Sequence, residues 1–512
     1  MNALKLISLA ILMTLHSAIA FGQQPEKNIV PDEILVKFKS GTSTELARDI
    51  NSANRGVTIE KLGDLGWQRV KLPAGFKLKA VIARYLDSGQ VEAVQPNFYY
   101  RLQLTPNDPD FSNSGMYGLT KISAPLAWDT NTGSSTVVVA NIDTGMRYTH
   151  EDLASNMWTN PGEINGNGLD DDVNGFIDDY YGWDFRYNDA DPLDENGHGT
   201  HTGGTIGAAG NNGLGVVGVN WSVRMMAIKI YSSSGTDTTS AMLINAYNYI
   251  RMMRERGVNI RVTNNSYGGC NEACGYDQAT KEAIDALGNV GVLNVFAAGN
   301  SSTNNDTTPF YPATYTSPSI ISVGASNSSD ARAYNFGLNS VDLVAPGVGI
   351  RSTYFTSNSS YDGLSGTSMA TPHVAGAAAL LASHNPSLSA ASLKATLLNS
   401  VDVLPQLAGF YKTGGRLNVA NALQNQTVCS FVPSAPSINV PTKGGYFSVN
   451  VTAAQNCDYS VKSNVNWINV SSSDVLSGNG TVTFRVTLNP TITRSGTIRI
   501  AGTDFTVNQS RN

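Results

Sequence analysis

The segment GTSMATPHVAG, residues 366–376, decides the fold of this chain of 512 residues. Ser368 stands at the start of a long apolar run, and we expect residues 369–383 to form a buried helix. The first backbone N–H groups of a helix have no partner within it, and the helix dipole favours negative charge there. Ser368 is therefore placed where a developing oxyanion would be stabilised.

Upstream of this segment, short apolar runs alternate with helical patterns. Continuous apolar strands between helices are typical of a mostly parallel sheet with helices on both faces. We therefore predict an α/β domain over residues 105–428, with its active site at the carboxyl ends of the strands. Its strands are predicted at residues 137–142, 223–230, 260–264, 292–297, 320–323 and 341–344, and its other helices at 239–256 and 277–287.

Two further segments carry residues that could activate the serine. In VVANIDTG (138–145) Asp143 ends an apolar strand, and in NGHGTH (196–201) His198 lies in a glycine-rich turn. A serine hydroxyl is a poor nucleophile until a base removes its proton, and an imidazole is a useful base when a buried carboxylate holds its tautomer. We predict that Ser368 attacks, His198 moves the proton and Asp143 orients His198.

These three segments resemble the Asp, His and Ser motifs of the subtilase family, in that family's chain order. The resemblance covers residues 128–423. An α/β-hydrolase would instead present Gly-x-Ser-x-Gly with the serine first. The resemblance implies a subtilisin-like fold and a serine endopeptidase that acts on polypeptides.

The resemblance also implies an oxyanion hole and a substrate edge. VFAAGN (295–300) is similar to the family segment whose asparagine, here Asn300, stabilises the oxyanion, and the loss of one such donor costs about 10²–10³ in rate. NSYGG (265–269) resembles the strand to which a substrate adds as a further β-strand. The implied substrate-binding residues are Ser266, Tyr267, Gly268, Ala298 and Gly299.

Other interpretations of these residues remain. His198 and His201 could form half of a metal site, and an inactive relative could bind peptides without cleaving them. We expect His150, His201 and His373 to be structural. Because all four catalytic positions hold competent residues, we favour catalysis.

The N-terminal region has the layout of an exported precursor. Residues 1–22 combine a lysine, a short apolar run and Ala18-Ile19-Ala20, which is typical of a signal peptide and too short for a membrane anchor. Residues 25–104 form a predicted small α+β unit that resembles subtilase propeptides, although an independent binding domain is an alternative. The resemblance implies an intramolecular inhibitor that is cleaved off between residues 100 and 110. We predict a secreted protein, extracellular or periplasmic, with no membrane span.

Beyond residue 433 the helical patterns stop. Alternating segments between Gly, Asn and Ser turns predict a β-sandwich, and residues 429–512 resemble a BACON-type domain. That family is associated with glycan binding, but Trp467 is more often a core residue, so a spacer role is an open alternative. The four cysteines, at 270, 274, 429 and 457, fall into two groups, which favours two local disulfides over a zinc site.

The charge distribution argues against a nucleic-acid partner. The formal net charge is −6, and acidic residues outnumber basic ones between residues 105 and 432, while both flanking regions are basic. Phosphate binding needs a concentrated basic face. A basic N-terminal unit could instead dock on the acidic body.

An acidic segment between the Asp and His motifs predicts a calcium site. GNGLDDDVNGFIDD (166–179) has oxygen side chains at alternate positions followed by Gly175, as in the first half of an EF-hand loop. The twelfth position is Tyr181, so another aspartate must close the shell. A solvated acidic loop is the alternative. The predicted ligands are Asp170, Asp172, Asn174, Phe176 and Asp179.

Overall fold

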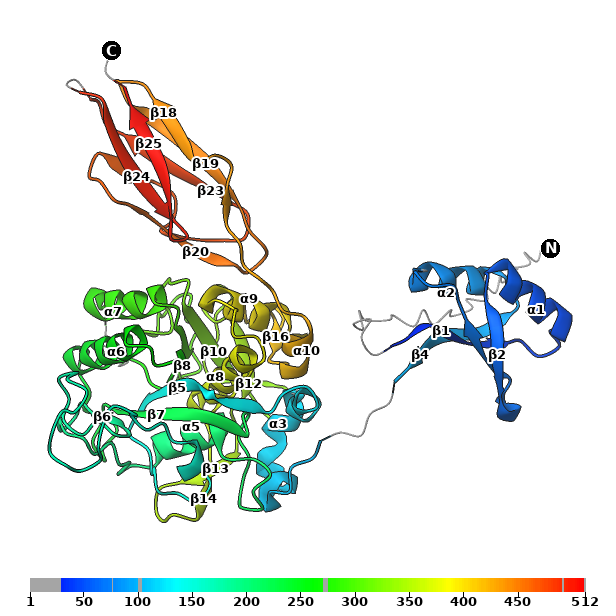
Figure 1. Ribbon diagram of the computed structural model, residues 1–512, viewed down its shortest axis with the longest axis horizontal. Helices are drawn as coiled ribbons and strands as arrows, with labels where there is room; N and C mark the ends of the chain where they lie inside the picture. Colours follow the sequence, from blue (N-terminus) through cyan, green and yellow to red (C-terminus); the bar gives the residue numbers. More distant parts are fainter. Residues whose placement is uncertain (1–28, 76, 100–103, 270–274, 490–491, 511–512) are drawn as a thin grey trace, which may run out of the picture. The chain divides into compact units, whose positions relative to one another are not determined.

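The computed structural model describes residues 29–510, apart from residues 76, 100–103, 270–274 and 490–491. The chain forms two compact units, Met1–Leu102 and Gln103–Asn512 (Figure 1). Within the described residues, no helix has both the length and the apolar character needed to cross a bilayer. The predicted signal peptide and the first cysteine pair lie outside the described residues.

The N-terminal unit is a four-stranded antiparallel sheet with two helices. Alternate side chains of the first strand, such as Ile34 and Val36, are fully buried, and they pack with Val81 and Tyr85 of the second helix. The sheet order is β2-β3-β1-β4. The elements are β1 (Ile29–Phe38), α1 (Thr44–Ala53), β2 (Val57–Leu62), β3 (Trp67–Lys71), α2 (Leu78–Asp87) and β4 (Val91–Phe98).

A largely parallel sheet forms the centre of the second unit, in the order β15-β16-β12-β10-β9-β8-β5-β7-β6, with β11 paired to β10. The pairs from β16 to β6 are parallel, whereas β15 and β11 are antiparallel to their neighbours. This confirms the predicted subtilisin-like α/β class. Its strands are β5 (Gly133–Asp143), β6 (Gly182–Asp184), β7 (Ser222–Lys229), β8 (Ile260–Asn265), β9 (Leu293–Ala297), β10 (Ile320–Ser326), β11 (Arg332–Ala333), β12 (Leu343–Pro346), β15 (Asp402–Val403) and β16 (Gly415–Arg416).

Both faces of this sheet are buried, which explains its continuous apolar strands. In β5, Val137 and Val139 face a core shared with α8, while Val138 and Ala140 face a core shared with α6 and α7. The ends of β5, β8 and β9 meet at one edge of the sheet. The helices are α3 (Tyr117–Lys121), α4 (Ala124–Trp128), α5 (His198–Gly207), α6 (Ser240–Glu255), α7 (Gln278–Asn289), α8 (Thr367–His384), α9 (Ala390–Asn399) and α10 (Val419–Gln424).

Two sheets form the C-terminal part of this unit, in the orders β17-β19-β23-β21 and β18-β25-β24-β20-β22. Val482, Phe484, Ile498 and Phe505 from both sheets share one core, as expected of a sandwich. Trp467 packs at its edge, with the Arg494 guanidinium 4.2 Å from the ring centroid. The longer strands are β19 (Gly445–Thr452), β20 (Asp458–Ser463), β23 (Gly480–Val486), β24 (Arg494–Ile500) and β25 (Thr503–Gln509), and the shorter ones are β17 (Val432–Pro433), β18 (Ser437–Val440), β21 (Ile468–Val470) and β22 (Val475–Ser477).

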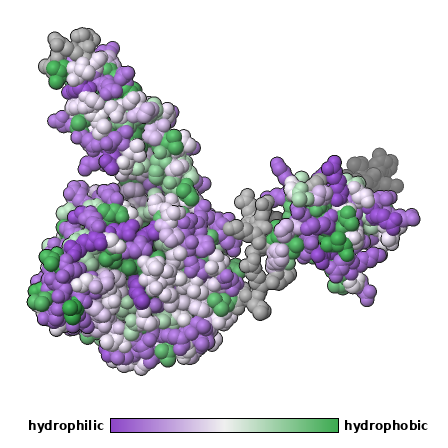
Figure 2. All heavy atoms as spheres, viewed as in Figure 1, coloured by the Kyte–Doolittle hydropathy of each residue, from purple (hydrophilic) through white to green (hydrophobic). Residues whose placement is uncertain are grey.

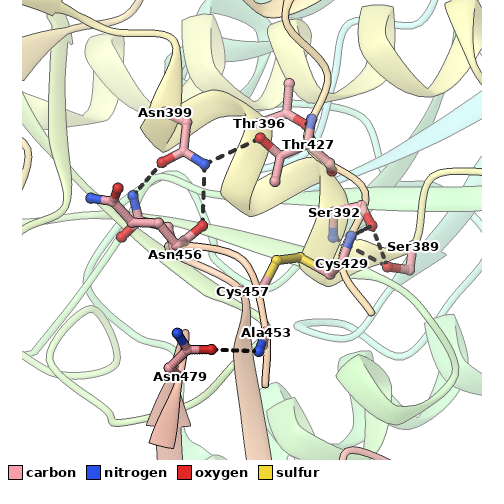
Figure 3. The surroundings of a disulfide bond; sticks show 11 residues. Ser389, Ser392, Thr396, Asn399, Thr427, Cys429, Ala453, Asn456, Cys457 and Asn479 are labelled. Atoms are coloured by element: carbon pink, nitrogen blue, oxygen red, sulfur yellow. Dashed lines mark hydrogen bonds between the residues drawn. A yellow bond between two sulfur atoms is a disulfide. The ribbon is translucent and has the colours of Figure 1, made fainter. Parts of the chain in front are cut away.

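The second predicted cysteine pair forms a disulfide, Cys429–Cys457, that joins the segment before the sandwich to the residue just before β20 (Figure 3). The Cys429 backbone N–H also donates to Ser392 Oγ of α9 at 3.0 Å. Asn456 Nδ2 donates to Asn399 Oδ1 at 2.7 Å. The segment before the sandwich is thus bonded to the first turn of α9, and the sandwich itself to the last residue of α9.

Polar residues dominate the surface of the second unit on the face drawn in Figure 2, with apolar residues scattered among them. Three of the exposed apolar side chains, Leu169, Val173 and Ile177, belong to the acidic segment, and Ile164 lies just before it.

Candidate active site

The end of β5 and the start of α5 bring Asp143 and His198 together. The Asp143 carboxylate is 2% exposed and lies 2.7 Å from His198 Nδ1 through Oδ1. The Thr144 backbone N–H donates to the same oxygen at 2.8 Å, and the Thr202 hydroxyl donates to the other oxygen at 3.2 Å. The carboxylate is therefore fixed on both sides and can orient the imidazole.

Four effects compete on the pKa of His198. Burial lowers it, but attraction to Asp143, the hydrogen bond to Asp143 and attraction to Asp194 together raise it above its ordinary value. The side chain is 29% exposed, so a substrate can reach it. The site thus favours the protonated imidazole that forms when His198 accepts a proton.

His198 is the first residue of helix α5, whereas the sequence predicted a glycine-rich turn. Glycine weakens helices, so the sequence pattern of this segment favoured a turn. Close packing explains the glycines, because a Cβ at Gly199 would lie 2.1 Å from the Gly145 oxygen and one at Gly204 2.3 Å from Thr353 Oγ1. The small residues let the helix lie directly against β13 (Ile350–Tyr354) and the end of β5.

Ser368 is the second residue of α8, as predicted from the apolar run. Its hydroxyl donates to the Ser266 carbonyl oxygen at 3.0 Å, and the Ser266 hydroxyl donates to the Ser368 carbonyl oxygen at 2.9 Å. These bonds connect the start of α8 to the end of β8. The nucleophile candidate thus lies at the carboxyl edge of the sheet.

Asn300 lies beside Ser368 because its side chain binds the residue before the serine. Asn300 Oδ1 accepts hydrogen bonds from the Thr367 backbone N–H at 2.8 Å and from the Thr367 hydroxyl at 3.0 Å. With Oδ1 engaged, the amide turns its Nδ2 donor away from Thr367. Asn300 as a whole residue is exposed.

The five implied substrate-binding residues follow β8 and β9 at this edge. Ser266 contacts Ser368 as described above, and Tyr267 shares hydrogen bonds with Tyr247 and Asn265. Gly268 has no room for a side chain, since a Cβ there would lie 2.0 Å from the Phe310 ring. Ala298 and Gly299 continue from β9, and Gly299 has φ +105° and donates to Thr367 Oγ1 at 3.1 Å.

The three histidines predicted to be structural each have a hydrogen-bond partner within the fold. His201 Nε2 lies 2.9 Å from the Ile350 carbonyl oxygen, and His373 Nδ1 lies 2.9 Å from that of Met369. Burial lowers the pKa of both to about 4. His150 Nε2 bonds the Ser360 carbonyl oxygen, and burial lowers its pKa too.

The carboxylates that gather near the acidic segment match the predicted ligands only in part, since Asp172 and Asp179 were predicted and Glu163, which precedes the segment, was not. Oxygens of Glu163, Asp172 and Asp179 lie within 4.8 Å of one another. Glu163 is 6% exposed, and its Oε2 has no hydrogen-bond partner among the described residues. Burial raises the pKa of Asp179 to about 6. Three crowded carboxylates with an unsatisfied buried oxygen fit a hard divalent cation, since such ions prefer oxygen ligands.

The other predicted ligands have different places. Asn174 Nδ2 donates to Asp172 and Asp179, so it lies at the cluster. Asp170 is not in the cluster, because its carboxylate accepts the backbone N–H groups of Asn174 and Gly175. The Phe176 ring packs on Trp183 and Tyr249. Sequence analysis missed Glu163 because it precedes the EF-hand-like pattern.

The fold and the residues at the carboxyl edge of the parallel sheet define the class of subtilisin-like serine endopeptidases. Comparisons with known proteins agree. A model of the subtilase family matches residues 134–429, and a model of the fervidolysin N-terminal prodomain matches residues 17–97. Thermitase of Thermoactinomyces vulgaris is 38% identical over 320 residues, which are 62% of this chain and 99% of thermitase. The thermophilic serine proteinase of Bacillus sp. (strain AK1) is 32% identical over 404 residues, which are 77% of this chain and 88% of that enzyme.

A solved structure of proteases from Pseudoalteromonas arctica PAMC 21717 aligns with a TM-score of 0.50 at 27% identity, over 62% of this chain and 99% of that one. The chain belongs to the subtilase family. It is a serine protease with an N-terminal prodomain, which is the arrangement of a zymogen, and it acts on polypeptide substrates.

Proposed function

We propose that this protein is a secreted endopeptidase that cleaves peptide bonds through Asp143, His198 and Ser368. The 2.7 Å contact between Asp143 and His198 Nδ1 carries the proposal, because it presents Nε2 as the base. His198 takes the Ser368 proton as Ser368 Oγ bonds the scissile carbonyl carbon. The C–N bond then breaks, the amine leaves with that proton, and water hydrolyses the acyl-enzyme by the same route.

The negative oxygen of the tetrahedral intermediate has two candidate donors, Asn300 Nδ2 and the Ser368 backbone N–H. The bonds from Thr367 to Asn300 Oδ1 support this role, since they fix the orientation of the amide beside Ser368 and leave Nδ2 unengaged by Thr367. Preorganised donors stabilise the transition state without reorganisation. The edge formed by Ser266, Tyr267 and Gly268 would pair with the backbone of an extended substrate.

The test is Ser368→Ala with Ser365→Ala as the matched control, because Ser365 is a neighbouring exposed serine. Ser368→Ala should lower kcat on casein by about 10⁶-fold and abolish labelling by phenylmethylsulfonyl fluoride. It should also accumulate with the N-terminal unit still attached, because the proposed zymogen cuts itself. Full activity in a folded Ser368→Ala protein would refute the triad, and peptide binding without cleavage by the wild type would support the inactive-relative alternative.

The position of that cut is constrained by the first residues of the second unit. Asp108 is 3% exposed and accepts the Asn211 backbone N–H at 2.7 Å. Asn107 Oδ1 accepts the Gly213 backbone N–H at 2.8 Å. Because these residues are bonded to the enzyme body, we place the cut before Asn107. N-terminal sequencing of the mature enzyme checks this position.

We also propose that the cluster of Glu163, Asp172 and Asp179 binds calcium and stabilises the fold. A ligand that binds the folded state adds about 2.7 kcal/mol at a hundred times its Kd. Calcium should therefore raise the Tm of the Ser368→Ala protein relative to EGTA, and Glu163→Gln with Asp172→Asn should remove that shift. Asp171→Asn is the control outside the cluster. An identical Tm in calcium and EGTA would refute the site.

A further inference from the structure

A second buried carboxylate lies next to the proposed triad. Asp194 is 2% exposed and precedes the turn that leads into α5. One oxygen, Oδ1, accepts the Thr144 hydroxyl at 2.8 Å and the backbone N–H groups of Asn196 and Gly197, both at 2.9 Å. The other, Oδ2, accepts the Thr200 backbone N–H at 2.8 Å and its hydroxyl at 2.6 Å.

These bonds join the two segments that hold the acid and the base. Thr144 follows Asp143 directly, and its hydroxyl oxygen also accepts the Gly199 backbone N–H at 2.9 Å. Gly197 and Thr200 flank His198 in the chain. Asp194 and Thr144 therefore fix the end of β5 relative to the first turn of α5, which sets the position of His198 next to Asp143.

The charge of Asp194 matters as well as its hydrogen bonds. Gly197 occupies the N-cap position of α5 and has no side chain, so Asp194 supplies the acceptor and the negative charge that favour a helix start. No Lys or Arg forms an ion pair with Asp194 among the described residues, so its charge acts on its surroundings uncompensated. Burial raises the pKa of Asp194, while its hydrogen-bond donors favour the ionised form.

We propose that Asp194 is a positioning residue for catalysis: it fixes His198 beside Asp143 and its charge stabilises the imidazolium. This inference rests on the proposed triad. The other titratable groups around Asp143, His198 and Asp194 come from β7 and the second residue after it, from the turn before α5, from the segment after β8, from α5, and from β13 and β14 (Ser360–Leu364). They are Lys229, Tyr231, Glu195, Tyr267, His201, Tyr354 and Asp362.

The first test compares Asp194→Asn with Glu195→Gln in the full chain. Glu195 is the adjacent carboxylate, but its charge is paired with Lys229 at 3.1 Å and it is exposed. Asp194→Asn should lower kcat by about 10²-fold with little change in KM, because misplacing a catalytic group has effects of this size. It should also move the acid limb of the kcat/KM profile to lower pH, since a lost negative charge lowers the pKa of His198. Glu195→Gln should neither lower kcat nor move the acid limb.

A second measurement does not depend on activity or maturation. In the Ser368→Ala protein, the imidazole of His198 can be titrated by NMR with and without Asp194→Asn. A lower titration midpoint in the double variant supports the inference, and an unchanged midpoint in a folded protein overturns it. Retained activity of Ser368→Ala alone would instead refute the proposed triad, so the two failures can be told apart.

Discussion

At the scale of single residues, the pair of His198 and Asp143 predicts the pH dependence of the reaction. His198 acts as a base only when neutral, and its pKa lies above the ordinary value, so activity should fall with decreasing pH earlier than an ordinary histidine would dictate. Asp143→Asn removes the main attraction that raises this pKa. It should therefore shift the acid limb of kcat/KM to lower pH while kcat falls about 10⁴-fold.

Stopped assays across pH 4–9 with a chromogenic peptide would measure both effects of Asp143→Asn. Asp191→Asn is a suitable control, because Asp191 is an exposed acceptor for Tyr148 away from His198. An acid limb that does not move, with the expected loss of kcat, would mean that Asp143 only orients the ring.

Burial of His373 predicts a loss of stability in acid. Its folded pKa is about 4, below that of an unfolded histidine, so the unfolded chain binds the extra proton between pH 6.5 and 4. Each such group lowers the free energy of unfolding by about 1.4 kcal/mol per pH unit in this window. The stability difference between wild type and His373→Gln should therefore shrink as pH falls, measured by urea unfolding of Ser368→Ala proteins. A difference independent of pH would contradict the prediction.

At the scale of elements, α5 shows how tertiary contacts override local preference. Gly204→Ala would improve helix propensity by about 1 kcal/mol. Its Cβ would, however, lie 2.3 Å from Thr353 Oγ1 and 3.0 Å from the Thr353 nitrogen, and overpacking of this kind costs about 1–3 kcal/mol. We expect a net loss of stability and a lower kcat, because α5 carries His198.

The matched control for Gly204→Ala is Gly363→Ala in β14, where a Cβ would meet nothing within 4 Å. Thermal unfolding and kcat of both variants can be compared in the mature enzyme. A Gly204→Ala protein that is as stable and active as Gly363→Ala would show that α5 can shift without cost.

The same helix marks the limit of prediction from sequence. β5 and α8 were predictable because a continuous apolar run is a direct sign of a buried strand or helix. α5 was not, since its glycines serve contacts with other elements. Asp143, His198 and Ser368 lie at the carboxyl edge of the sheet where the motifs predicted them, and their catalytic roles stay a prediction. Glu163 and Asp194 join their sites through the folding of loops, which no local pattern encodes.

At the scale of the whole molecule, one ion pair joins the α/β domain to the sandwich. Lys394 Nζ of α9 lies 2.8 Å from Asp458 of β20, and the side chains are 4% and 7% exposed. Burial opposes both charges, but their attraction raises the pKa of Lys394 and lowers that of Asp458. Lys394→Met should destabilise the full chain by about 3–5 kcal/mol, because it leaves a buried carboxylate unpaired.

Calorimetry of the Ser368→Ala protein would measure this effect, with the exposed Lys443→Met as control. Adding Asp458→Leu to Lys394→Met should restore much of the loss, since an apolar pair avoids the cost of desolvating charge. If the single variant melts like the wild type, the sandwich does not depend on this contact.

The Cys429–Cys457 disulfide has a consequence for cleavage of one copy of this protease by another. The bond spans a sequence separation of 28 residues, within which lie β17, β18 and β19 of the sandwich. A neighbouring protease that cuts the chain once inside this loop produces two polypeptides that remain covalently joined. Such a molecule migrates as a single species without reductant and as two fragments with it, whereas a cut just before Cys429 leaves the sandwich held only by non-covalent contacts such as the Lys394–Asp458 ion pair. The disulfide therefore keeps the sandwich covalently attached to the rest of the protein after a single cut inside the loop.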